Sequence, residues 1–140
     1  MSVNLPSEGE RIKHLEFIQA VIARIGNNSF AIRGWAVTVT GALLVVSIQT
    51  ENWRVAVVTL CMAMAFWVLD GSYVRRERMF RLLYDDVAQG HSPQVPTFSM
   101  SVEGYAPSVN LAGVLFSGTI LMVHLPLMFI DATIAVLLFE

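Results

Sequence analysis

Charged residues are scarce in this chain. Asp, Glu, Lys and Arg make up only 14% of its 140 residues, whereas soluble domains carry about 25%. Hydrophobic residues make up 55%, and the single cysteine, Cys61, excludes a disulfide within one chain. This composition excludes an ordinary soluble domain and indicates a membrane protein.

Motifs of the common enzyme classes are also absent. The sequence has no Walker loop, no glycine-rich dinucleotide-binding turn, no nucleophile elbow and no cysteines or histidines at metal-ligand spacing. Its histidines, His14, His91 and His124, lie far apart along the chain. The segments outside the hydrophobic runs are too short to form a substrate domain with its own core. We therefore expect no enzymatic activity, no cofactor and no metal site.

Three hydrophobic runs occupy residues 30–48, 53–69 and 111–139. Each approaches or exceeds the ~20 residues that a helix needs to cross the hydrocarbon core of a bilayer. We expect an all-α membrane protein in which residues 30–72 form a transmembrane hairpin and residues 111–140 a third transmembrane helix. Within the second span, Ala56, Ala63 and Asp70 repeat every seven residues and are expected to face one partner. A break at Pro126 would instead give two half-spans, but no polar residue is placed to cap lipid-exposed backbone there.

The basic residues predict the orientation in the membrane. All of them except Arg54 lie before the first span or at its start, as Arg33 does, or follow the second. The positive-inside rule therefore places the N-terminus and the segment between the second and third spans in the cytoplasm. The first 33 residues carry seven charges and no secretory signal, so we expect a multi-pass protein of the bacterial inner membrane.

Residues 1–29 are predicted to form a cytoplasmic or interfacial amphipathic helix. Ser7 and Glu10 have the spacing of a capping box, and the residues at 26–29, Gly-Asn-Asn-Ser, are typical of a helix end. Between them an apolar face recurs at three- and four-residue spacing, at Ile12, Leu15, Ile18, Ile22 and Ile25. This helix lies at the membrane surface or against its neighbours, or it forms a gating collar.

Residues 73–110 are predicted to form a cytoplasmic helix that continues the second span, followed by a loop. Residues 98–102 alternate in polarity, which indicates either a short strand or an irregular connector. The helix carries four arginines, Arg75, Arg76, Arg78 and Arg81, and Arg81 is predicted to pair with Glu77 four residues before it. Such a cluster is typical both of a headgroup anchor and of a binding site for an anionic ligand.

The third span contains a stripe of polar residues. Ser117, His124 and Asp131 are seven residues apart and share one face of a helix. Ionisable residues inside a membrane are costly and usually face a bundle interior or a water-filled cavity. Two interpretations stay open. The stripe packs against neighbouring helices, or it lines a pore in a homo-oligomer, with Asp131 favouring cations and Pro126 acting as a hinge.

Two segments resemble small bacterial inner-membrane proteins. They are HLEFIQAVIARIGNNSFAIRGWAVTV, which begins at His14, and FWVLDGSYVRRERMFRLLYDDV, which begins at Phe66. The chain is similar to the membrane effector of the Hailong anti-phage defence system. That resemblance implies an oligomeric ion channel controlled by a short oligonucleotide that a partner nucleotidyltransferase makes. It also implies that the four arginines contact this ligand and that the third span belongs to the pore.

We therefore expect a homo-oligomeric channel in the lipid bilayer that is gated by a nucleotide-like signal and depolarises the cell. A non-conducting membrane scaffold that recruits a cytoplasmic partner is the main alternative. A proton-coupled transporter ranks last, because the sequence lacks inverted repeats and paired broken helices.

Overall fold

The computed structural model describes residues 7–90, 96 and 98–140. Its elements are α1 (Glu8–Gln49), α2 (Trp53–Gln89), the short 3₁₀ helix η1 (Glu103–Ser108), α3 (Leu111–Leu115) and α4 (Gly118–Phe139). Of these described residues, 88% are helical, and no strand occurs among them. Of the two alternatives for residues 98–102, the irregular connector is confirmed. We call residues 98–110, which include η1 and lead to α3, the connector. His91 lies outside the described residues.

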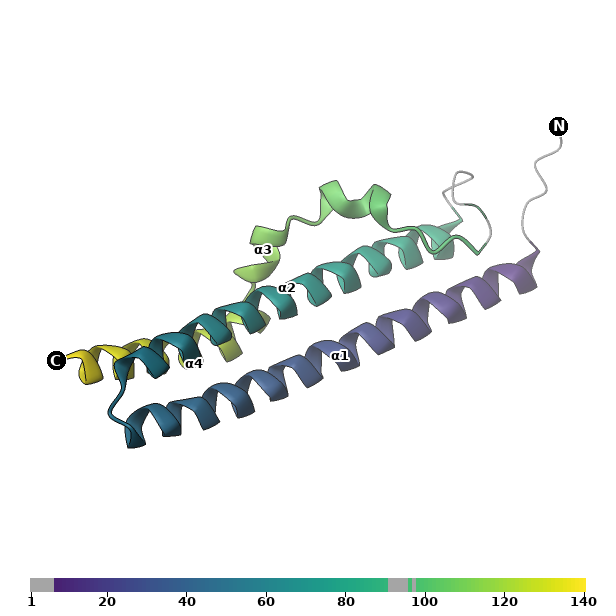
Figure 1. Cartoon of the computed structure of the whole chain (residues 1–140). Helices are drawn as coiled ribbons and strands as arrows, with labels where there is room; N and C mark the ends of the chain where they lie inside the picture. Colours follow the sequence, from purple (N-terminus) through teal and green to yellow (C-terminus); the bar gives the residue numbers. More distant parts are fainter. Residues whose placement is uncertain (1–6, 91–95, 97) are drawn as a thin grey trace.

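Helices α1 and α2 form a long antiparallel hairpin (Figure 1). The capping box is confirmed, because the Ser7 hydroxyl accepts from the Glu10 backbone N–H and the Glu10 carboxylate accepts from that of Ser7. At the other end, α1 stops at Gln49, and the Asn52 side chain accepts from the Arg54 backbone N–H to cap α2. Glu51 between them has a positive φ of 49°. Local hydrogen bonds in this tight turn therefore end α1 and start α2.

The helix end predicted at residues 26–29 is wrong. α1 is a single helix of 42 residues that runs through this segment without a break. Asn and Ser cost only a few tenths of a kcal/mol each inside a helix. Long-range contacts outweigh that cost, because Ile25 packs against α2 and the Ser29 hydroxyl donates to Asp70.

Three helices, α1, α2 and α4, are long and apolar enough to cross a membrane. At ~1.5 Å per residue, the 42 residues of α1 and the 37 of α2 far exceed the ~30 Å of the hydrocarbon core. The surplus lies at the end of the hairpin where α1 begins and α2 ends (Figure 1). We call this part, residues 8–28 of α1 and 74–89 of α2, the stem.

Small residues line the contact between the three spans. Ala56, Ala63 and Asp70 are all buried, which confirms that this seven-residue repeat on α2 faces one partner surface. α1 contributes Ala36, Thr40 and Ser47, and each of them is 0% exposed. Gly34 and Thr38 face outward instead. Close approach through small side chains is the usual way that helices associate in lipid.

The stem has a hydrophobic core of its own. Ile18 and Ile25 of α1 pack against Phe80 and Leu83 of α2. The connector covers this core with Met100, Val102 and Tyr105. His14 is buried, and its Nε2 lies 2.9 Å from the Ser99 carbonyl oxygen, so this histidine joins the connector to α1.

The third hydrophobic run is two helices and not the single one predicted. α3 ends at Leu115, and α4 begins after Ser117, whose backbone is extended. Contacts with α2 hold this corner in place. The Trp67 indole N–H donates to the Leu115 carbonyl at 3.1 Å, and the Leu115 side chain packs where Gly71 has no side chain.

Pro126 does not break α4, which runs without interruption to Phe139. Phe139 lies edge-on to Trp53, with ring centroids 5.4 Å apart. The C-terminus therefore lies at the same end as the α1–α2 turn and opposite the start of α1 (Figure 1). This arrangement agrees with the expectation of three spans.

Candidate functional site

A buried carboxylate joins all three spans. Asp70 of α2 is 0% exposed. The Ser29 hydroxyl of α1 donates to its Oδ1 at 2.5 Å, and the Arg33 guanidinium Nε donates to its Oδ2 at 2.8 Å. His124 Nε2 of α4 lies 3.2 Å from the same Oδ2. We call these four residues the Asp70 cluster.

The Asp70 cluster lies near one boundary of the apolar layer. Asp70 follows Trp53 by 17 residues, which places it about 26 Å along α2 from the turn. Arg33 is partly exposed, so its charge reaches toward the nearby interface while its Nε neutralises the carboxylate. A buried charge without a partner would cost several kcal/mol at this depth. The ion pair with Arg33 therefore allows an aspartate to be buried between three helices.

The predicted polar stripe of α4 faces the hairpin. His124 and Asp131 are 1% and 2% exposed. Ser117 is half-buried at the N-cap of α4, where its side chain makes no capping bond. In the arrangement described, the stripe thus lies inside a single protomer, as in the packing interpretation. Its assignment to a pore stays a prediction.

Each residue of the stripe has a buried polar atom without a hydrogen-bond partner among the residues described. These atoms are Ser117 Oγ, His124 Nδ1 and Asp131 Oδ2. Native interiors leave few such atoms, and those that remain are often functional. The stripe is therefore more polar than the packing of one protomer requires.

Asp131 is the most isolated of the three. It lies eight residues before Phe139, which contacts Trp53, so it is about 12 Å inside the apolar layer. Thr40 and Thr59 lie at a similar depth, but their hydroxyls donate to their own helices, to the carbonyls of Ala36 and Val55. Neither hydroxyl is thus available as a donor to the Asp131 carboxylate.

The four predicted ligand arginines have different surroundings. Arg75 donates to two connector carbonyls, from Nε to Val109 at 2.8 Å and from Nη2 to Ala106 at 3.1 Å. Arg81 pairs with Glu77, which confirms the predicted pair four residues apart. Arg76 and Arg78 are exposed and make no ion pair with the residues described. Arg75 thus holds the connector, while Arg76 and Arg78 are free to bind an anion.

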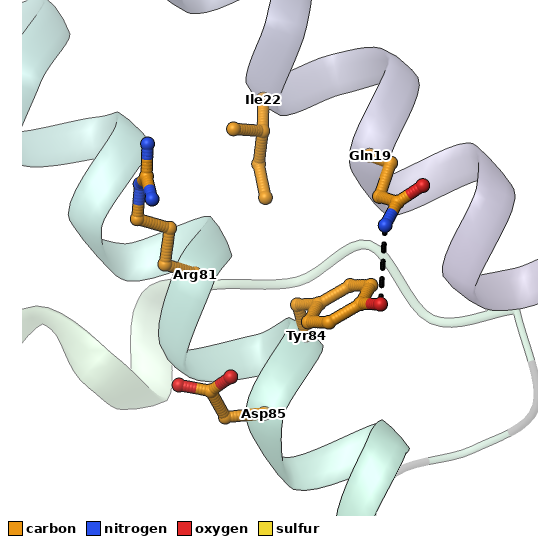
Figure 2. A pocket seen from close by; sticks show the side chains of 5 residues that line it. All are labelled: Gln19, Ile22, Arg81, Tyr84 and Asp85. Carbon is orange, nitrogen blue, oxygen red and sulfur yellow. Dashed lines mark hydrogen bonds between the residues drawn. The ribbon is translucent and has the colours of Figure 1, made fainter.

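Two hollows of the stem include these arginines. One, of about 370 Å³, lies between α1 and α2 and is lined by Gln19, Ile22, Arg81, Tyr84 and Asp85. In Figure 2, the Gln19 amide donates to the Tyr84 hydroxyl across this hollow, at 3.1 Å. The second, of about 490 Å³, includes Arg78 and Arg81 together with residues 108–110 of the connector. Both include residues of the stem.

Sequence reasoning identified His124 but not the acid to which it binds. Asp70 was recognised only as part of a packing repeat, and Ser29 as a helix cap. An acidic residue at the end of an apolar run, with Arg33 inside another, was the available signal. No group of three or more metal-ligating side chains is found within the residues searched.

No family model, curated protein or solved structure matches this chain. The resemblance to the Hailong effector therefore stays a prediction from the two quoted segments.

Proposed function

We infer that the protein is a homo-oligomeric ion channel of the bacterial inner membrane whose conducting path includes the polar stripe of α4. The observation that carries this proposal is the set of three unpartnered polar atoms on Ser117, His124 and Asp131. Ionisable groups inside a membrane face a bundle interior or a water-filled cavity, and many of them mark ion pathways. A ring of Asp131 carboxylates from several copies would favour cations.

The arrangement described corresponds to a closed state in this proposal, because the stripe is buried against α1 and α2. Opening requires α4 to turn or to separate from the hairpin. The corner at Ser117 is the point about which α4 would turn, since the helix is interrupted there and the Ser117 side chain makes no capping bond. The His124–Asp70 contact is the polar bond that such a movement must break.

The stem would carry the sensor. An anionic nucleotide or short oligonucleotide, supplied by a partner nucleotidyltransferase, would bind at Arg78 and Arg81 in the hollows beside them. Arg75 would transmit the signal, because it bonds the connector that leads to α4. The N-terminus and the stem are cytoplasmic in this proposal, and opening depolarises the cell as part of anti-phage defence.

Cysteine scanning in liposomes tests the channel. Cys61 is first replaced by alanine, and Ser117, His124 or Asp131 is then replaced by cysteine. Met122 and Phe129 of α4, which are 80% and 71% exposed on the other side of the helix, provide matched control positions. We expect a water-soluble thiol reagent to block cation flux at the three stripe positions only. Equal block at the control positions, or flux unaffected at all five, would reject the stripe as the path.

A non-conducting scaffold is the second candidate. It is favoured by exposed apolar side chains on the stem and the connector, where Ile12, Phe17 and Phe98 are 51%, 52% and 42% exposed. Such a patch outside the membrane is typical of a protein-binding surface. A stoichiometric cytoplasmic partner that Phe17→Ser releases, together with an absence of ion flux, would support the scaffold over the channel.

A further inference from the structure

A third hollow lies beside α2 and has a different chemistry from the two on the stem. It measures about 370 Å³ and is lined by Ser72, Tyr73, Arg75, Arg76, Met79 and Leu111. No acidic residue lines it. We call it the boundary hollow, because its residues include those with which α2 leaves the apolar layer.

Its depth separates it from the stem hollows. Tyr73 follows Trp53 by 20 residues, which is about 30 Å of helix and equals the thickness of the hydrocarbon core. Arg76 is then about 5 Å beyond that boundary, within the headgroup layer. Arg81 is about 12 Å beyond it and faces water. A phosphate that binds at Arg76 is thus at the depth of a lipid phosphate.

The boundary hollow carries positive charge that no carboxylate among the described residues offsets. Arg75 bonds to two carbonyl oxygens, which fix its position but leave its charge in place. Arg76 makes no ion pair there, because the nearest acid along the helix, Glu77, pairs with Arg81. The Ser72 hydroxyl donates to the Val68 carbonyl, so the Tyr73 hydroxyl and the two guanidinium groups are the donors that remain for an anion.

The remaining lining residues are apolar. Met79 is buried, and Leu111 is half-buried at the start of α3. Such a surface next to two arginines suits a molecule that has a phosphate and a hydrocarbon part together. We propose that the boundary hollow binds the phosphate of an anionic phospholipid of the inner leaflet, with Arg76 as the principal contact. This site is separate from the proposed signal site and does not depend on channel activity.

Lipid-dependent thermal stability tests the proposal. The full-length protein is purified in a neutral detergent and titrated with mixed micelles of phosphatidylglycerol or phosphatidylcholine. We expect saturable stabilisation by phosphatidylglycerol only, and an apparent Kd about five-fold higher for Arg76→Gln, as expected for one lost surface cation. Arg76→Lys should retain most of the affinity because it keeps the charge. Arg24→Gln, which removes an exposed arginine from the stem, is the matched control.

Three results would overturn the proposal. Equal stabilisation by the two lipids would show that no anionic site exists. An equal loss of affinity in Arg24→Gln and Arg76→Gln would show a diffuse charge effect. Competition by glycerol 3-phosphate at the same concentration would assign the site to a soluble phosphate. Arg76 is exposed and makes no side-chain bond to the described residues, so its variants are expected to fold like the wild type.

Discussion

Replacement of Asp70 tests whether the Asp70 cluster holds the three spans together. Asp70→Asn keeps the shape of the side chain but removes the charge that Arg33, 2.8 Å away, neutralises. Breaking a buried ion pair by removing one partner costs about 3–5 kcal/mol, because the remaining charge is left uncompensated. Arg33 is 21% exposed, so water reduces this cost, and we expect about 3 kcal/mol.

The other two bonds to Asp70 contribute much less. Side-chain hydrogen bonds between membrane helices average about 0.6 kcal/mol each. We therefore expect Ser29→Ala to lower the free energy of unfolding by roughly that amount, well below the effect of Asp70→Asn. The double variant Asp70→Asn with Arg33→Gln should recover part of the loss, since it leaves no unpaired charge.

Reversible unfolding in mixed micelles, followed by helix content, measures these free energies. The reasoning would be refuted if Asp70→Asn changed stability by less than Ser29→Ala, or if the double variant were less stable than Asp70→Asn alone. Thr38, an outward-facing residue of α1, provides a control as Thr38→Ala, because its hydroxyl only donates to the Gly34 carbonyl of its own helix.

Two further predictions concern the connector and the corner that lead to α4. Gly71→Val should lower the free energy of unfolding by about 1–3 kcal/mol, because its side chain would meet that of Leu115, whereas Gly41→Ala, with no neighbour within 4 Å, should not destabilise the fold. Equal effects of the two in the same micelle assay would contradict the close contact at Leu115. Burial and the bond to Asp86 raise the pKa of Tyr105 from 10.0 to about 12. The folded state therefore holds the Tyr105 proton more tightly than the unfolded state. The free energy of unfolding should not change through this group below pH 10, and it should fall as the pH rises from 10 toward 12. Tyr105→Phe should remove that part of the alkaline loss, and an unchanged pH profile would reject the cause.

Local patterns predicted the helices well where local bonds determine them. The capping box, the apolar runs and the Glu77–Arg81 pair all depend on residues a few positions apart. The repeat of Ala56, Ala63 and Asp70 correctly indicated a buried face, because it depends only on the geometry of one helix.

Long-range contacts account for what local patterns missed. The residues at 26–29 have the composition of a helix end, but Ser29 bonds to a residue 41 positions away and the helix continues. The break at Ser117 is likewise fixed by Trp67 and Gly71 of another helix. No local pattern shows which helix faces meet, so the partners of Asp70 could not be assigned from the sequence.

Asp70 and Asp131 differ in their hydrogen bonds, and this difference predicts different effects of their replacement on stability and on cation flux. Both are buried carboxylates, but Asp70 has three partners and Asp131 has an oxygen with none among the residues described. Replacing a satisfied carboxylate removes bonds, whereas replacing an unsatisfied one removes a desolvation cost. We therefore expect Asp131→Asn to leave stability unchanged or to raise it while it lowers cation flux, and Asp70→Asn to lower stability. If Asp131→Asn destabilised the protein as much as Asp70→Asn, Asp131 would be a packing residue, and the assignment of the α4 stripe to the conducting path would be rejected.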